Sequence, residues 1–160
     1  MAILAVDRMI DAELALFLQQ GLAINIGTRD ATLAPHAAYA PAALVEPGGT
    51  HVVIYAPAVG ADAVLADLAG NGQAAVVFAR PMDDRACQVK GTYVSHRPAT
   101  DDERSLVDSQ WNGFMQQLEM IGTPGESTRT WVIWPCVAIR LRVTALFNQT
   151  PGPDAGARLS

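Results

Sequence analysis

The chain has little positive charge and no long apolar run, and each shortage excludes a class of protein. Its 160 residues include 11 Lys and Arg against 16 Asp and Glu, a formal net charge of −5. This balance gives no attraction for nucleic acid or for an anionic membrane surface. No apolar run approaches the roughly 20 residues of a spanning helix, and Asp7, Arg8, Asp11 and Glu13 interrupt any signal-peptide core. We expect a soluble, cytoplasmic protein without nucleic-acid or membrane partners.

Cysteine and the common catalytic motifs are also scarce. Cys87 and Cys136 each lie in an apolar strand pattern, so neither a disulfide framework nor a metal knuckle is indicated. We interpret them as buried thiols, the alternative being a redox pair. The three histidines lack metal-ligand spacing, no nucleotide-binding glycine fingerprint occurs, and no serine lies in a nucleophile elbow. We therefore expect no metal site and assign no catalytic residue.

Alternating apolar residues dominate what is present, and half of the chain is hydrophobic. This is enough for a single domain over residues 1–160 that buries about 70% of its unfolded surface. A capping box formed by Thr100 and Glu103 predicts the start of a long helix with a wide apolar face. Shorter helices are predicted over 11–20 and 60–69. Extended segments are predicted over 22–27, 32–43, 51–56, both arms of a hairpin within 73–95, and 131–147.

These six strands favour a closed antiparallel barrel with helices packed outside and across one end. Pro35 and Pro41 interrupt the second strand, which we expect to be bent or at an edge because proline has no N–H to donate. Closure would remove the unpaired edges that such apolar strands otherwise expose to aggregation. The fold class predicted is therefore mainly β with peripheral helices.

Polar side chains on the hairpin are the candidates for a site. Gln88 and Lys90 alternate with Cys87 and Val89, so they face outward if the latter face the core. They then lie either on a solvated strand face or in a cleft. Arg80 and Arg85 flank the turn of the hairpin. They either clamp a phosphate through bidentate hydrogen bonds or pair with Asp83 and Asp84 at an exposed hairpin tip.

The hairpin AVVFARP...QVKG and the segments APHAAYAP, HVVIYAP and FNQTPGP carry a resemblance to a known family. Over nearly its whole length, the chain resembles the pyridoxamine 5'-phosphate oxidase-like FMN-binding split barrels. The resemblance implies a six-stranded split barrel, FMN as cofactor, and a homodimer with the flavin in a cleft between its two barrels. We expect the helix that carries Trp111 and Phe114 to contribute to the dimer contact. By the same analogy, the cleft would be lined by His36, Tyr55, Arg80, Gln88, Lys90, Asn148, Gln149 and Arg158.

The chain departs from the true oxidases at several positions. It has Ala37 and Ala38 where they carry an arginine, and Gly60, Ala61 and Asp62 replace a basic Ser-Arg-Lys segment. These changes remove phosphate donors. We therefore expect an FMN-binding flavoprotein and oxidoreductase, with an unknown small-molecule substrate, that is not the vitamin B6 oxidase itself. The alternative is a non-enzymatic ligand-binding or sensor protein with weak or lost flavin binding. A haem-binding role is a third possibility, because PHAAYAP is also similar to the haem-utilisation branch of the fold.

Overall fold

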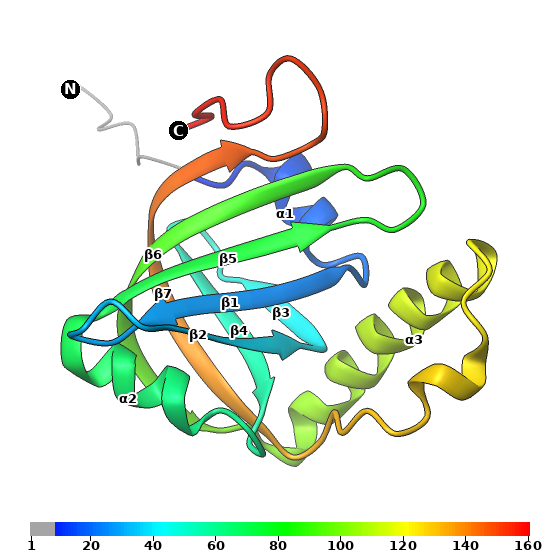
Figure 1. Ribbon diagram of the computed structural model, residues 1–160, viewed down its shortest axis with the longest axis horizontal. Helices are drawn as coiled ribbons and strands as arrows, with labels where there is room; N and C mark the ends of the chain where they lie inside the picture. The colour runs from blue at the N-terminus through cyan, green and yellow to red at the C-terminus, as the bar shows by residue number, and fades with distance from the viewer. Residues whose placement is uncertain (1–8) are drawn as a thin grey trace.

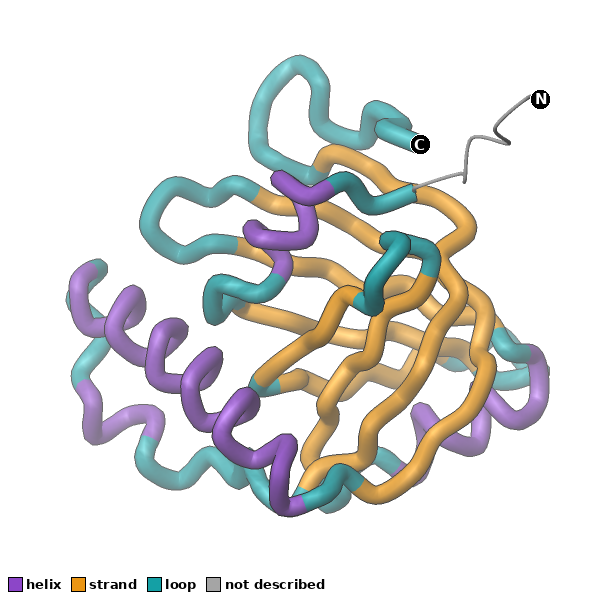
Figure 2. The backbone as a smooth tube through the Cα atoms, turned by 180° about the vertical axis from the view of Figure 1, so that it is seen from behind, coloured by secondary structure: helices purple, strands orange, loops and turns teal. Residues whose placement is uncertain are grey.

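Seven strands and three α-helices make up residues 9–160, the part of the chain that this computed structural model describes. The strands pair antiparallel in the order β2-β1-β5-β6-β7-β4-β3, in one sheet that curls around its core (Figure 1, Figure 2). The strands are β1 (Ala23–Arg29), β2 (Pro35–Ala40), β3 (Ala42–Val45), β4 (His51–Pro57), β5 (Gln73–Ala79), β6 (Ala86–Pro98) and β7 (Cys136–Asn148). The helices are α1 (Ala12–Leu18), α2 (Asp62–Asn71) and α3 (Arg104–Met120), with 3-10 turns at Asp101–Glu103 and Gly125–Thr128.

The first eight residues lie outside the described residues. Asp7 and Arg8 belong to this segment; they are two of the four charged residues on which the prediction of no signal peptide rests. The start of the predicted domain also belongs to it. None of the helices in residues 9–160 is both long and apolar enough to pass through a bilayer.

Pro41 divides the second predicted strand into two. β2 ends at Ala40 and β3 begins at Ala42, and the two strands lie at opposite edges of the sheet. Proline has no N–H to donate to a ladder, so a strand cannot be paired continuously through this position. The prediction of a mainly β, antiparallel split barrel with peripheral helices is confirmed. The sheet has seven strands where six were predicted, because the segment 32–43 supplies both edges.

Side chains at every second position fill the inside of the barrel. Ile24 and Ile26 of β1 pack there with Val89 of β6 and Leu141 of β7. The two cysteines are free and buried, as predicted. Burial raises the pKa of Cys87 to about 11 and that of Cys136 to about 12, so both remain protonated thiols at neutral pH.

The predicted capping box is present, whereas one predicted strand begins late. The N–H of Thr100 donates to Glu103 Oε2 over 2.8 Å, which completes the capping box before α3. Gly72 adopts φ 69° at the end of α2, where a left-handed residue closes the helix. The extended prediction from Trp131 is wrong for its first five residues. β7 starts at Cys136, after Pro135, which cannot donate to a ladder.

The helix α3 covers the outside of β3, β4 and β7. Val107 packs there against Val53 and Tyr55 in a second, smaller apolar cluster. Trp111 and Phe114 are only 8% and 7% exposed. Their rings are therefore covered largely by this chain itself.

Glutamine side chains satisfy the free edge of β3. Gln110 on α3 accepts from the N–H of Ala43 over 3.0 Å and donates to its carbonyl over 2.8 Å, so its amide takes the place of a neighbouring strand. Gln19 accepts from the N–H of Val45 over 3.1 Å. An unpaired edge strand is a template for aggregation, and these amides cover it without adding a strand.

We predict that Gln110→Ala lowers the free energy of unfolding by about 1–3 kcal/mol, because it leaves the buried N–H and carbonyl of Ala43 without partners. Urea unfolding measures the difference. The matched control is Gln116→Ala, since Gln116 lies exposed on the same helix and its loss is expected to change stability by less than about 0.5 kcal/mol. Equal stabilities of the two variants would contradict the role of Gln110.

Candidate functional site

The outer surface of β1, β5 and β6 carries a patch of small and polar side chains, which we call the open face. Along each of these strands, the side chains of the open face alternate with side chains that face the core. Backbone pairing aligns its members in rows: Gly27 lies opposite Ala75, which lies opposite Lys90, and Asn25 lies opposite Val77, which lies opposite Gln88. The open face consists of Asn25, Gly27, Arg29, Gln73, Ala75, Val77, Gln88 and Lys90.

No helix of the described chain packs over the open face. Figure 1 shows β1, β5 and β6 in front, with α2 at one end of the barrel and α3 beside β3. The helix α2 buries Val64 and Leu68 in the barrel core, and α3 covers the outer surface of other strands, β3, β4 and β7. A broad, weakly polar surface therefore remains accessible.

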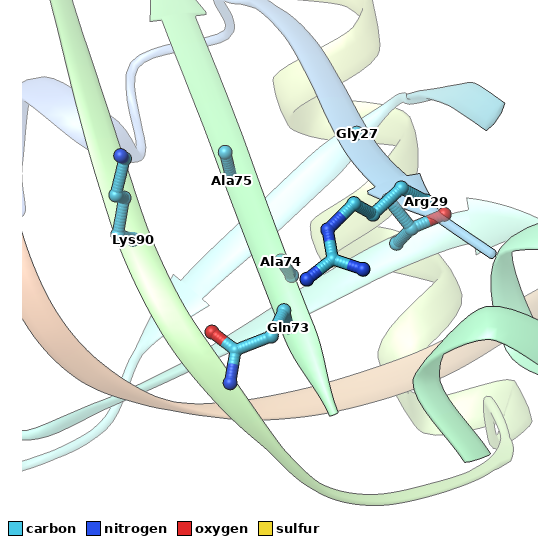
Figure 3. A pocket seen from close by; sticks show the side chains of 7 residues that line it. Gly27, Arg29, Gln73, Ala74, Ala75 and Lys90 are labelled. Atoms are coloured by element: carbon cyan, nitrogen blue, oxygen red, sulfur yellow. The ribbon is translucent and has the colours of Figure 1, made fainter. Parts of the chain in front are cut away.

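A hollow of about 350 Å³ lies at one end of the open face. Arg29, Gln73 and Lys90, on three neighbouring strands, line it on the same side of the sheet (Figure 3). Gly27 forms part of its floor. A Cβ added to Gly27 would meet only the Ala75 carbonyl, at 3.7 Å, so the sheet itself does not require a glycine there. The missing side chain deepens the hollow.

Unpaired positive charge gathers at this hollow. Within residues 9–160, five arginines form ion pairs with carboxylates, whereas Arg29 and Lys90, like Arg129, Arg142 and Arg158, form none. The ammonium of Lys90 lies 5.3 Å from the centre of the Phe147 ring, and Arg142 of β7, which pairs with Thr92 of β6, is exposed. In a chain of net charge −5, free cations on one face provide a site for an anion.

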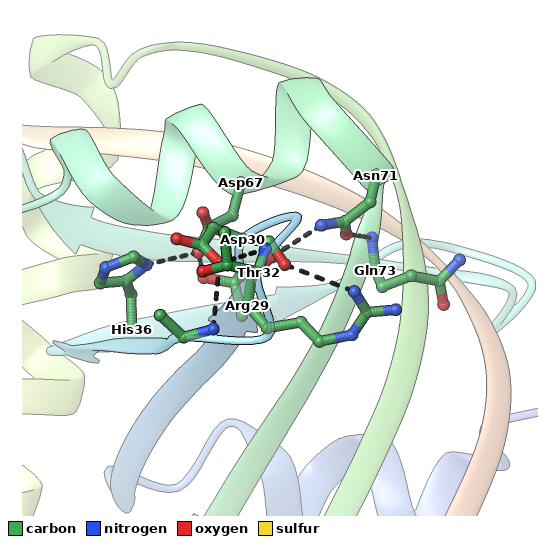
Figure 4. Close-up of polar contacts among 9 residues, drawn as sticks. Arg29, Asp30, Thr32, His36, Asp67, Asn71 and Gln73 are labelled. Atoms are coloured by element: carbon green, nitrogen blue, oxygen red, sulfur yellow. Dashed lines mark hydrogen bonds and ion pairs between the residues drawn. The ribbon is translucent and has the colours of Figure 1, made fainter.

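Hydrogen bonds from α2 fix the end of β1 that carries Arg29. Asp67 on this helix accepts from the Thr28 hydroxyl over 2.7 Å and lies 2.8 Å from His36 Nδ1. Asn71 donates to the Arg29 carbonyl over 2.6 Å (Figure 4). The backbone around Arg29 is therefore held at Thr28 and at its own carbonyl, while its guanidinium forms a single long hydrogen bond, of 3.5 Å, to the Asp30 carbonyl and no ion pair among the described residues.

The predicted site residues do not all lie together. Gln88 and Lys90 face outward, as their alternation predicted, and both belong to the open face. His36 turns toward Asp67 on α2 and is about one-third exposed. Arg80 forms two hydrogen bonds with Asp83, of 2.9 and 2.6 Å. This is the hairpin-tip alternative considered for that arginine.

Tyr55 lies on the outer surface of β4, away from the open face and beneath the start of α3. It is 1% exposed and its hydroxyl donates to Glu103 over 2.9 Å. Arg97 donates twice to the same carboxylate, over 2.8 and 2.7 Å. The tyrosine is therefore part of the contact that docks α3 onto β4.

The remaining predicted residues belong to the C-terminal arm. Asn148 donates to the Asp154 carbonyl over 3.2 Å, and Arg158 pairs with Phe147 in an isolated bridge. The N–H of Gln149 donates to the Ala86 carbonyl over 2.9 Å. The arm thus folds back along the end of β7, beside the row that contains Gln88.

Sequence reasoning missed Arg29 and Gln73. The alternation of Leu22, Ile24 and Ile26 did indicate that the intervening positions face outward. It did not show that β1 lies next to β5, which places Arg29 near Gln73 and Lys90. Within residues 9–160, no group of three His, Cys, Asp or Glu side chains is arranged to hold a metal ion.

Comparisons with known proteins connect this architecture to a fold. No protein-family model and no curated protein matches the sequence. HupZ from Group A Streptococcus is 15% identical over 92% of this chain and 100% of that one, with a TM-score of 0.56. An FMN-binding protein from Syntrophomonas wolfei is 12% identical over 86% and 87% of the two chains, TM-score 0.53. A candidate pyridoxamine 5'-phosphate oxidase from Lactobacillus delbrueckii is 11% identical over 88% and 94%, TM-score 0.54.

The fold is that of the FMN-binding split barrels. In this split barrel, the residues around Tyr55 and those around Lys90 lie on different outer surfaces of the same sheet. Identities of 15% or less show a shared fold alone.

Glu103 makes the docking of α3 dependent on pH. Hydrogen bonds from Arg97 lower its pKa from 4.5 to about 2, so the folded state is stabilised above pH 4.5 and loses this stabilisation as the pH falls toward 2. We predict that Glu103→Gln flattens this decline in urea unfolding measured between pH 5 and 2.5. The control Glu119→Gln, at an exposed position of α3, should retain the wild-type slope. A Glu103→Gln protein with the wild-type slope would contradict the assignment.

Proposed function

We propose that this protein binds FMN on its open face and acts as a flavin-dependent oxidoreductase, with a second copy of the chain covering the cofactor. The observation that carries the proposal is the hollow beside Arg29 and Lys90, two unpaired cations on a face that no described helix covers. A phosphorylated ligand with a flat ring system matches a charged hollow that continues into a flat row of side chains.

The charged end of the face suits a phosphate. Arg29 offers a planar guanidinium and Lys90 an ammonium, and the amide of Gln73 lies between their strands. Each hydrogen bond between a phosphate and a charged donor contributes about 1.5–3 kcal/mol. These residues would supply donors in place of the basic residues that the chain lacks at positions 60–62.

The middle of the face suits the flavin ring. Val77 offers an apolar surface, and the amides of Asn25 and Gln88 each provide donors and an acceptor for the alternating N–H and carbonyl groups of the ring's pyrimidine edge. When bound, FMN supplies the hydride chemistry. The protein's own residues orient the ring, hold the phosphate and, with the second copy, exclude water.

Removing the cations tests the phosphate site. Lys90→Gln and Arg29→Gln should each weaken FMN binding by about tenfold or more, since about 1.4 kcal/mol corresponds to tenfold. Gly27→Leu should block binding by filling the hollow. Titration followed by flavin fluorescence measures the dissociation constants. Arg104→Gln, which removes an exposed charge from α3, is the matched control and should bind as the wild type does. If the wild type does not take up FMN, or if all four variants bind equally, the proposal fails.

The mass of the protein in solution tests whether a second copy of the chain covers the open face. Sedimentation should give the mass of two chains for the wild type and of one chain for Val77→Glu, because a carboxylate at the centre of the face would be buried without a partner. Val59→Glu, on an exposed loop before α2, should remain a dimer. A wild-type protein with the mass of a single chain would contradict this part of the proposal.

A non-enzymatic flavin carrier or sensor is the second candidate. One feature favours it: the open face contains no carboxylate and no histidine, so Lys90, which the proposal assigns to the phosphate, is the only open-face side chain that could act as a general acid or base. Reduction of the FMN-loaded protein by NADH or NADPH distinguishes the two candidates. A rate well above that of free FMN favours the oxidoreductase, and a rate equal to that of free FMN favours the carrier.

A further inference from the structure

Four aromatic side chains gather at the far end of β1 from Arg29. Trp111 and Phe114 of α3 lie next to Tyr39 of β2 and to Trp131, which is in the loop before β7. The Trp131 centroid lies 5.4 Å from that of Trp111 and 5.7 Å from that of Tyr39. These rings, with Ala23, Ile24, Asn25 and Ala40, line a hollow of about 120 Å³.

The walls of this hollow are held in place by contacts outside it. α3 is fixed to β3 through the two hydrogen bonds of Gln110. It also approaches the start of β1 closely, because a Cβ added to Gly21 would lie 2.4 Å from the Gln110 carbonyl. The Tyr39 hydroxyl donates to the Val132 carbonyl, which fastens the loop carrying Trp131 to β2. The hollow is therefore preformed and does not depend on a ligand to assemble it.

The lining defines the chemistry of an occupant. It contains no ionisable group apart from the tyrosine, whose hydroxyl is already bonded to Val132. The Asn25 amide and the indole N–H groups of Trp111 and Trp131 form no hydrogen bond within the described residues. An apolar cavity of about 150 Å³ is known to bind benzene, so a single six-membered ring matches the observed volume. Stacked and edge-on contacts favour an aromatic ring over an aliphatic one.

We infer that this hollow binds one planar aromatic ring with a hydrogen-bonding substituent, the class represented by phenols, and that Asn25 or an indole N–H bonds the substituent. The inference goes beyond FMN binding and does not require it. Asn25 also belongs to the open face, so a ring bound here would lie next to the row that contains Val77 and Gln88.

Phenol is the probe, added to purified wild-type protein without FMN and followed by amide chemical shifts. Saturable shifts are expected at residues 23–25 and 39–40. Cyclohexanol, which has the same hydroxyl without the aromatic ring, should bind at least tenfold more weakly. Absence of saturable shifts with phenol, or equal binding of cyclohexanol, would overturn the inference.

Two variants test the location. Ala23→Leu should fill the hollow and weaken phenol binding at least tenfold, whereas Ala63→Leu, on the exposed side of α2, should leave it unchanged. Trp131→Ala removes one wall at a position that is 43% exposed, so it tests the same hollow if Ala23→Leu does not fold. Phenol binding that is unchanged in Trp131→Ala, or in a folded Ala23→Leu, would overturn the inference. Because no flavin is present, the outcome is independent of the FMN titration.

Discussion

The closure of one antiparallel sheet across Pro41 is the constraint on which the rest of the structure depends. Each strand pairs with the next in the order from β2 to β3, with two register shifts between β6 and β7, and these two edge strands are consecutive segments of the chain. The two edge strands are not hydrogen-bonded to each other. The single residue Pro41 joins them, so the backbone itself holds the end of β2 next to the start of β3. Once the sheet is curled in this way, alternation along each strand assigns side chains to the interior or to the outer surface, except at the register shifts between β6 and β7.

The two halves of the outer surface differ in what covers them. On β3, β4 and β7 the helix α3 is docked by apolar packing and by the amide of Gln110, and an ion pair joins Glu103, just before the helix, to Arg97 near the end of β6. On β1, β5 and β6 the outward side chains are small or polar, and no described helix covers them. The open face combines free charge near Arg29 and Lys90 with an aromatic hollow near Trp131. Arg29 and Ala23 are six residues apart on β1, about 20 Å along the strand, so one face presents two chemically distinct ends.

Local patterns in the sequence predicted much of this arrangement. The alternation around Val89 correctly placed Gln88 and Lys90 outside the barrel, the Thr100 signal marked the start of α3, and the two thiols are buried as expected. These features depend on neighbours within a few residues. The split at Pro41 was only partly predicted: proline indicated a bend or an edge, but not that the two halves separate to opposite edges.

The candidate site was less predictable because it depends on contacts between distant segments. Periodicity showed that Tyr55 lies on a strand but not that α3 would cover it, since that follows from a hydrogen bond to Glu103, 48 residues away. Arg29 escaped notice because its neighbours Gln73 and Lys90 come from strands far along the chain. The pairing of Arg80 with Asp83 was one of two alternatives, and local sequence gave no reason to prefer either.

The most direct test of the account is where FMN protects the backbone. Amide hydrogen exchange of the wild-type protein should slow on FMN addition in residues 23–29, 73–79 and 86–92, the strands that form the open face. The segment 101–120, which contains α3, should be unaffected. Protection confined to α3 and β4, or no change in any strand on saturation with FMN, would contradict the claim that the open face is the ligand surface of this protein.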